Sequence, residues 1–237
     1  MPNFEIVHQD QDLLVIDKAP GITVFPENED QTEETLIDQL ITAFPYLKEA
    51  GMPPRYGIAH RLDKDTSGLL LVAKNSQFLE VLQKQFEDRQ TIKKYLTLLQ
   101  GKVTTKEGQI NSLIGRCPSN RTKQCAFSPI GPDATKKGLR PAITDWKVVE
   151  IYDDFTLVEA YPKTGRKHQL RVHFSSIGHP IVGDQVYGFK DSKTIPGLSR
   201  QFLHAAYLKI KMANGQEKEF NSPLPPDLQN IILNLEK

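Results

Sequence analysis

Short apolar stretches with strand-like spacing occur throughout the chain. Residues 4–8 and 13–17 predict two strands joined by a polar turn, and residues 69–73, Leu-Leu-Leu-Val-Ala, predict a buried strand. Further strands are predicted at 91–100, 142–151, 155–161, 202–212 and 216–221, the last two joined at Asn214-Gly215, a dipeptide typical of hairpins. The segment 101–141 lacks such a pattern, and we expect a long irregular loop that either binds a partner or is partly mobile.

Helices are predicted where apolar residues recur every three or four positions. Residues 36–44 form one such segment, and Thr32, in the acidic stretch 27–34, is its predicted N-cap. A second helix, with Asn75 or Ser76 as N-cap, covers 78–86. A third covers 170–177 and ends before Gly178, and residues 227–235 predict a short last helix.

The composition is that of a soluble protein with a substantial core. The chain has 237 residues, of which 38% are hydrophobic and 25% charged, enough for one large domain or two closely packed halves. No run of eighteen apolar residues and no secretory signal is visible, so we predict a cytoplasmic protein without a membrane partner. Cys117 and Cys125 could be bridged, but we expect the cytosol to keep them reduced, and their spacing fits no zinc site.

The charge is unevenly distributed along the chain. Residues 1–54 contain two cations and eleven acids, a net charge of −9, so the remainder carries +10. Residues 93–140 contain ten cations against Glu107 and Asp133. Phosphate groups respond to the local field, so this segment is either a surface that binds nucleic acid or a solvated lysine-rich loop.

Residues 60–68, His-Arg-Leu-Asp-Lys-Asp-Thr-Ser-Gly, place two acids and an arginine directly before the buried strand. Polar groups beside an apolar core need partners, and their pKa values are often shifted for chemistry. The alternative is that Asp63 and Asp65 only cap a turn with their side chains. The chain has no glycine-rich nucleotide loop, no metal-binding spacing and no Gly-x-Ser-x-Gly elbow. Carboxylate chemistry on a polyanionic substrate, without cofactor or metal, is therefore the chemistry that we consider.

Several segments together resemble the RluA-type pseudouridine synthases. The resembling segments are His60-Arg61-Leu62-Asp63 with Thr66-Ser67-Gly68, Asp17-Lys18-Ala19-Pro20-Gly21, Lys94-Tyr95, 165–173, 178–188 and Phe202-Leu203-His204-Ala205. The resemblance extends from about residue 5 to 225. Phe25 departs from it, since many relatives have histidine there. The extra N-terminal RNA-binding domain of larger relatives has no counterpart, so we expect the catalytic core to recognise the target.

The resemblance implies roles for individual residues. Asp63 is the catalytic aspartate, which attacks or assists while the glycosidic bond of a uridine is broken and a carbon–carbon bond is made. Arg171 is the expected ion-pair partner of Asp63, and Tyr95 stacks on the uracil ring. Arg61 enters the RNA stack as the base is flipped out. The cations predicted to bind RNA are Arg61, Arg116, Arg121, Lys123, Arg140, Arg166 and Lys167.

For the remaining polar residues of these motifs we predict structural roles. His60, His168 and His173 are expected to form hydrogen bonds within the motif turns, and Asp65 to bond a backbone amide. Asp184 and Tyr187 are expected to serve as turn and packing residues.

The predicted fold is α+β: a mixed, mainly antiparallel β-sheet flanked by helices, with a central active cleft, in a single catalytic domain over 1–237. The predicted activity is isomerisation of specific uridines in structured RNA, tRNA or rRNA, by a monomer. The alternatives are a catalytically silent RNA-binding protein on the same scaffold and a carboxylate-dependent hydrolase. The hydrolase would need a second catalytic carboxylate, for which only Asp65 is available.

Overall fold

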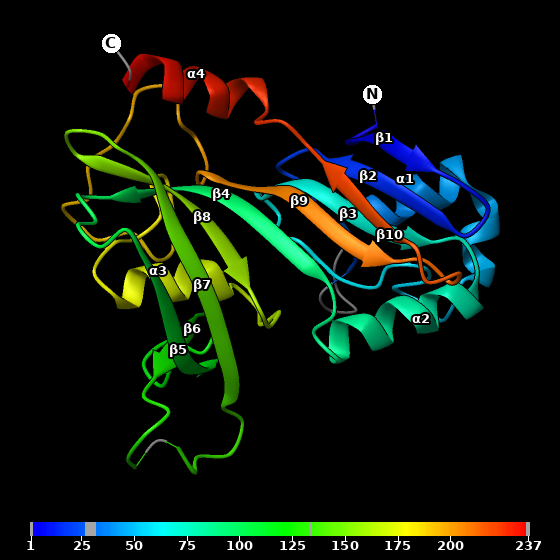
Figure 1. The fold of residues 1–237 in the computed structure, drawn as a ribbon, viewed down its shortest axis with the longest axis horizontal. Coiled ribbons are helices and arrows are strands. Elements are labelled where there is room, and N and C mark those ends of the chain that lie inside the picture. The colour runs from blue at the N-terminus through cyan, green and yellow to red at the C-terminus, as the bar shows by residue number, and fades with distance from the viewer. Residues whose placement is uncertain (1, 27–31, 133, 236–237) are drawn as a thin grey trace. The chain divides into compact units, whose positions relative to one another are not determined.

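The computed structural model describes residues 2–26, 32–132 and 134–235, and its chain divides into two compact units. Unit 1 comprises residues 1–92 and 205–223, and unit 2 comprises residues 93–204 and 224–237. Both units combine antiparallel strand pairs with helices, so the predicted α+β class is confirmed (Figure 1). Each unit is described separately below.

Unit 1 contains a sheet in the order β1-β2-β3-β9-β10. Its strands are β1 (Phe4–Gln9), β2 (Leu13–Lys18), β3 (Ser67–Ala73), β9 (Leu203–Lys211, of which the first two residues belong to unit 2) and β10 (Glu217–Asn221). The pairs β1–β2, β2–β3 and β9–β10 are antiparallel. Every residue of β3 is buried, as its apolar sequence predicted. Gly68 permits the close approach of β9, because a Cβ there would lie 2.4 Å from the carbonyl oxygen of Ala205.

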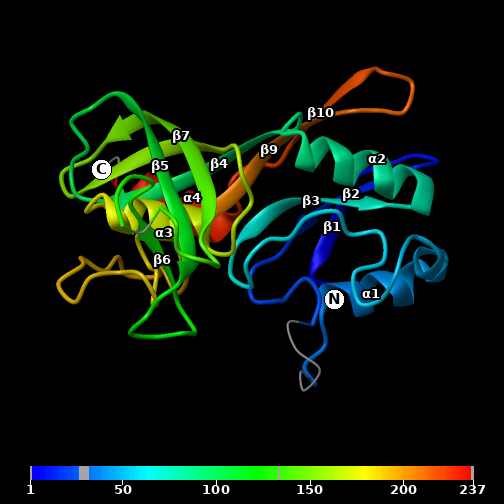
Figure 2. The same ribbon diagram turned by 90° about the horizontal axis from the view of Figure 1, so that it is seen from below.

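Two helices cover opposite sides of strands β2 and β3 (Figure 2). Helix α2 (Ser76–Glu87) packs Phe78, Leu79 and Leu82 against alternate residues of β2 and β3. Asn75 is its N-cap, since the Asn75 side chain accepts the Phe78 amide at 2.8 Å, as predicted. Helix α1 (Leu36–Ala43) lies on the other side and is followed by the short 3-10 helix η1 (Pro45–Glu49).

Helix α1 begins after Thr35, so the prediction of Thr32 as its N-cap was wrong. Asp38, three residues beyond Thr35, accepts hydrogen bonds from the Thr35 amide at 2.9 Å and hydroxyl at 2.6 Å. This reciprocal capping arrangement is available to Thr35 and not to Thr32, which has no acid three residues later. Most of the acidic stretch noted before this helix, residues 27–31, lies outside the described residues.

Unit 2 contains a sheet in the order β4-β8-β7-β5-β6. Its strands are β4 (Ile92–Gln100, with its first residue in unit 1), β5 (Glu107–Arg116), β6 (Gln124–Phe127), β7 (Arg140–Ile151) and β8 (Phe155–Pro162). All four neighbouring pairs are antiparallel. The prediction of an irregular loop over 101–141 was therefore wrong, because β5 and β6 form there and pair with each other and with β7.

Two helices in unit 2 pack on alternate side chains of its strands. Leu170 and Phe174 of α3 (Gln169–Ser176) join a cluster with Leu99 and Val158. The neighbouring residues Leu98 and Leu157 instead join a cluster with α4 (Pro226–Leu235). Since successive strand residues point to opposite faces, α3 and α4 cover the two faces of this sheet. Gly178, with φ of 85°, follows the end of α3 as predicted.

Candidate active site

The turn that carries Asp63 is held by hydrogen bonds at both ends. Asp63 is half-buried between the buried residues Leu62 and Thr66, and its carbonyl oxygen accepts the Thr66 amide at 3.1 Å. The His60 imidazole accepts the Leu71 amide of β3 at 3.0 Å, and its ring packs on Phe86. This contact confirms the structural role predicted for His60. The backbone around Asp63 is thereby fixed relative to β3.

Lys18 supplies a third attachment point for this turn. Its side chain is fully buried, and its ammonium group donates to the carbonyl oxygens of Ala19 at 2.8 Å, Ile22 at 3.0 Å and Lys64 at 2.9 Å. The Gly21 amide also donates to the Lys64 carbonyl, at 2.9 Å. A buried cation needs such acceptors, so Lys18 joins the turn at 17–21 to the Asp63 turn. Sequence reasoning identified the 17–21 motif but assigned no role to this lysine.

Tyr95 lies on β4 of unit 2, opposite Ala160 of β8. It is half-buried and packs against the cluster that contains Leu99, Val158 and Ala160. Lys94 points to the other face, where it forms an ion pair with Glu159 at 2.9 Å. Apolar packing below the Tyr95 ring is compatible with the predicted stacking role, which stays a prediction.

Lys93 is a residue of interest that sequence reasoning missed. It lies two positions before Tyr95 and therefore on the same face of β4. Withdrawal of its ammonium group from water lowers the pKa of Lys93 to about 8. Lys93 therefore loses its proton at a lower pH than an exposed lysine, and only the packing of the folded chain reveals this property.

Arg171 forms a buried, two-point ion pair with Asp184. Its Nε donates to Asp184 Oδ2 at 2.7 Å and its terminal nitrogen to Oδ1 at 2.9 Å. The two side chains are 7% and 0% exposed. Burial alone would raise the pKa of Asp184, but hydrogen bonds from Arg171 and from the amides of Tyr187 and Val186 hold it below its usual range.

Asp184 therefore has more than the turn role predicted for it. Its Oδ1 does accept the amides of Val186 and Tyr187, each at 2.9 Å, which confirms the predicted turn. Its function as the counter-ion of Arg171 was missed. The signal was present in the sequence, because residues 160–183 contain four cations and no acid, and Asp184 is the first carboxylate after them.

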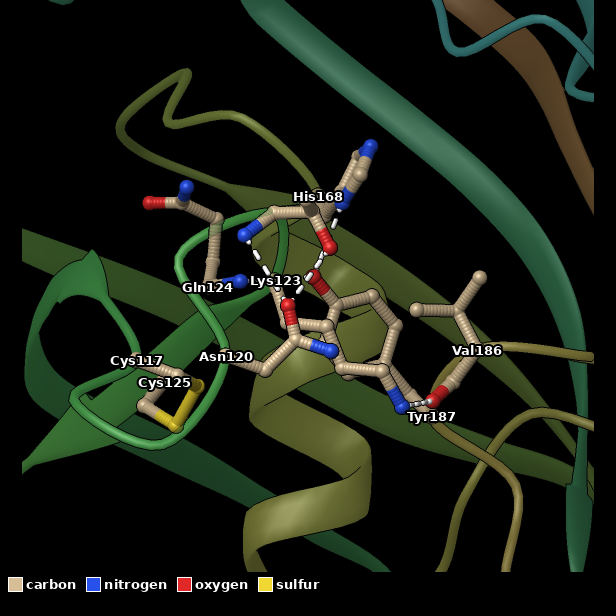
Figure 3. Close-up of a disulfide and its surroundings, with 9 residues drawn as sticks. Cys117, Asn120, Lys123, Gln124, Cys125, His168, Val186 and Tyr187 are labelled. Atoms are coloured by element: carbon tan, nitrogen blue, oxygen red, sulfur yellow. Dashed lines mark hydrogen bonds between the residues drawn. A yellow bond between two sulfur atoms is a disulfide. The ribbon is translucent and has the colours of Figure 1, made fainter.

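Tyr187 connects this turn to the β5–β6 hairpin (Figure 3). Its hydroxyl lies 2.8 Å from His168 Nδ1 and accepts the Gln124 amide at 3.0 Å, while Lys123 Nζ donates to the Val186 carbonyl at 2.7 Å. The prediction of a structural His168 is confirmed. The same holds for His173, which is buried between the hydroxyls of Ser112 and Thr144, at 3.0 and 2.9 Å. Burial lowers the pKa of His173 to about 4.

A disulfide joins Cys117 and Cys125 across the same hairpin (Figure 3). The expectation that these cysteines remain reduced was therefore wrong for this structure. Strand pairing explains their proximity, because Gly115 lies opposite Cys125 and the Cys117 amide donates to the Lys123 carbonyl at 3.0 Å. Their Cα atoms are consequently 5.0 Å apart, within the range that a disulfide spans.

Three of the predicted RNA-binding cations gather at one end of the β5–β7 pair. Arg140 lies opposite Ile114, two residues before Arg116, and Arg166 Nε donates to the neighbouring Pro141 carbonyl at 3.1 Å. Arg121 and Lys167 are exposed. Lys123 is half-buried and has the backbone partner described above. Arg116 and Arg140 thus lie at the ends of strands β5 and β7, whereas Arg121, Lys123, Arg166 and Lys167 lie in turns and irregular segments.

The predicted catalytic residues are distributed over both units. Asp63 and Arg61 belong to unit 1, whereas Tyr95 and Arg171 belong to unit 2. The ion pair between Asp63 and Arg171, and the central cleft, therefore stay predictions. Among residues 2–26, 32–132 and 134–235, no three His, Cys, Asp or Glu side chains are grouped to hold a metal, and no helix could cross a membrane.

Comparison with known proteins identifies the family. The sequence model described as RNA pseudouridylate synthase matches residues 12–176. The chain belongs to this family. The resemblance found in the motifs is thus confirmed, and the family consists of isomerases that act on uridine in RNA.

Individual pseudouridine synthases are similar over almost the whole chain. An uncharacterized RNA pseudouridine synthase of Bacillus subtilis is 38% identical over 99% of this chain and 74% of its own length. A ribosomal large subunit pseudouridine synthase D of Nitrosomonas europaea is 38% identical over 96% of this chain, which spans 64% of that relative. The solved structure of human RNA pseudouridylate synthase domain containing 1 has a TM-score of 0.75 and 32% identity, over 97% of this chain and 88% of that one.

Proposed function

We propose that this protein converts specific uridines of structured RNA to pseudouridine, with Asp63 as the catalytic carboxylate. The observation that carries the proposal is the Asp63 turn, which hydrogen bonds from Thr66, Lys18 and Gly21 hold while the aspartate itself stays half-buried. A reactive group on a fixed backbone needs little reorganisation when the substrate arrives. Membership of the pseudouridylate synthase family supports the same assignment.

In the proposed reaction, the target uridine leaves the RNA stack and its base enters the site. Arg61 occupies the vacated place in the stack, because an enzyme that acts on a base must extrude it. The Asp63 carboxylate attacks or assists while the bond from the ribose to uracil nitrogen is broken and the bond to a uracil carbon is formed. That carbon loses its proton and the freed nitrogen takes up a proton, so the product is an isomer of uridine. Tyr95 stacks on the detached uracil, and the Arg171 guanidinium favours the ionised form of Asp63. The reaction requires no cofactor in this scheme.

The proposed substrate class is ribosomal RNA, with transfer RNA as the alternative. The Nitrosomonas relative is named for the large ribosomal subunit, which supports the first choice. The cations at 116, 140 and 166 offer positive charge that phosphate groups of either RNA would contact. We propose that the protein acts as a monomer in the cytoplasm.

The experiment is to map pseudouridines in total RNA from cells with the gene, without it, and with Asp63→Asn. We expect at least one position to lose its pseudouridine in both altered strains. Purified protein should then restore that position in an unmodified transcript, and the Asp63→Asn protein should bind the transcript without converting it. If every position is retained in both strains, the enzyme assignment is wrong, and RNA binding without conversion by the wild type would favour the silent RNA-binding alternative.

A further inference from the structure

Two arginines of unit 1 that shortly precede Asp63 in the sequence lie against the same aromatic ring. The guanidinium carbon of Arg55 lies 4.6 Å from the centre of the Phe25 ring, and that of Arg61 lies 5.0 Å from it. Phe25 is 5% exposed, whereas Arg55 is exposed and Arg61 half-buried. A buried ring therefore holds two cationic groups, one of them at the surface, within cation–π distance.

The backbone that carries Arg55 is fixed against β3. Gly57 accepts the Ala73 amide at 2.8 Å, and a Cβ on Gly57 would lie 2.0 Å from the Ala73 carbonyl oxygen. Ile58 forms a bridge with Val72, one residue earlier on the same strand. Only glycine allows this approach, so the position of Arg55 is set by the fold and not by a mobile loop.

The positive charge of Arg55 and Arg61 contrasts with the acidic sequence that precedes them. Residues 1–54 carry a net charge of −9, yet the next cation, Arg55, converges with Arg61 on one ring. In the described part of the chain, no carboxylate forms an ion pair with Arg55. Arg55 is also exposed, so its guanidinium can contact an anion from outside the chain.

The chemistry of arginine indicates which anion would fit. A guanidinium over an aromatic ring keeps its N–H donors in one plane at the edge of the group, and these donors match phosphate oxygens in pairs. Arg61 is two residues before Asp63, so the RNA that delivers a uridine to Asp63 has its backbone near this ring. Phosphodiester groups are thus the ligand that both geometry and charge favour.

We propose that Arg55 is a further RNA-binding residue that contacts a phosphodiester beside the target uridine, and that Phe25 is a positioning residue for both Arg55 and Arg61. This inference rests on the proposed function and adds a site in the acidic unit of the protein. Phe25 stands where many relatives carry histidine, and its ring gives a purely apolar stacking surface at this position.

The test measures binding of a fluorescein-labelled RNA stem-loop with uridines in its loop, by anisotropy, in the Asp63→Asn background so that no turnover occurs. Arg55→Ala is expected to raise Kd about five- to ten-fold and to reduce the slope of log Kd against log salt by nearly one, between about 50 and 200 mM salt. The charge-matched control is Lys84→Ala on α2, whose side chain is 76% exposed and which should leave Kd unchanged.

Phe25 is tested by a double-mutant cycle. Phe25→Leu should weaken binding by several-fold when Arg55 is present and by clearly less when Arg55 is alanine, and Phe25→Tyr should restore affinity. Equal weakening by Phe25→Leu in both backgrounds would make Phe25 a packing residue only, and an Arg55→Ala protein that binds like Lys84→Ala would overturn the site. Neither result would contradict the proposed activity, whereas a wild-type protein that does not bind RNA would overturn both the proposed activity and the Arg55 site.

Discussion

The Arg171–Asp184 ion pair allows a stability prediction of defined size. Asp184→Asn keeps the shape of the side chain and can still accept the Val186 and Tyr187 amides, but it removes the negative charge from a side chain that is 0% exposed. Breaking one partner of a buried pair typically costs about 3–5 kcal/mol. Because domains of this size are stable by only about 5–15 kcal/mol, the variant should unfold at a much lower urea concentration.

Trp146 provides a fluorescence signal for this unfolding measurement. It is the single tryptophan of the chain, it is buried, and it belongs to the cluster that contains Leu170 and Phe174 of α3. Its fluorescence therefore reports the unfolding of the unit that contains the pair. The control is Asp145→Asn, which removes an exposed ion pair with Lys163. The Lys163 and Asp145 side chains are 52% and 36% exposed, so the loss of this pair should lower the free energy of unfolding by less than about 1 kcal/mol.

The pH dependence gives a second check on the same pair. The pKa of Asp184 is held below that of an unfolded aspartate, near 3.9. Its contribution to stability is therefore fully present above about pH 4 and is lost as the pH falls through the lower pKa of the folded state. The difference between wild type and Asp184→Asn should accordingly shrink in acid. A difference below about 1 kcal/mol at pH 7, or one that does not change in acid, would refute the view that this ion pair holds Arg171.

Four further outcomes are expected. Cys117→Ser should lower the free energy of unfolding by at most about 2.5 kcal/mol, the loop-closure value for a separation of 8 residues. Urea titrations with and without a dithiol reductant measure this difference. Thiol trapping in lysates shows whether the two cysteines are oxidised in cells. The free energy of unfolding of the wild type should fall by on the order of 3 kcal/mol from about pH 6.5 to pH 4. In this range the histidine takes up a proton in the unfolded chain, whereas buried His173, with its pKa of about 4, does not. A His173→Gln protein with the same pH slope of stability would contradict this explanation. Arg171→Lys should lower turnover more than RNA affinity, and equal losses in both would make Arg171 a phosphate contact. Arg121→Ala should weaken RNA binding in a salt-dependent manner, and an unchanged salt slope would remove the hairpin from the RNA interface.

The strongly apolar elements were predictable, whereas the strand with a weak pattern was not. β3 is apolar at every position from Leu69 to Ala73, and this part was identified from its sequence alone. β5 alternates buried Ile110, Ser112 and Ile114 with polar or half-buried residues, so only two apolar side chains mark its inner face. Such a segment becomes a strand because β6 and β7 satisfy its backbone hydrogen bonds, and neither partner can be inferred from the segment itself.

The candidate site shows the same division between local and long-range information. The motifs identified Asp63, Tyr95 and Arg171, because their neighbours along the chain are distinctive. The contacts that support the site were missed, since the partners are distant in sequence: Lys18 reaches Lys64, and the Tyr187 hydroxyl accepts the amide of Gln124. In each of these contacts the side chain bonds a backbone carbonyl or amide, a group that nearly every residue possesses and that therefore leaves no mark in the sequence. Their selection depends on the strand pairing of the whole unit, and for that reason a positioning residue is harder to predict than the reactive residue that it serves.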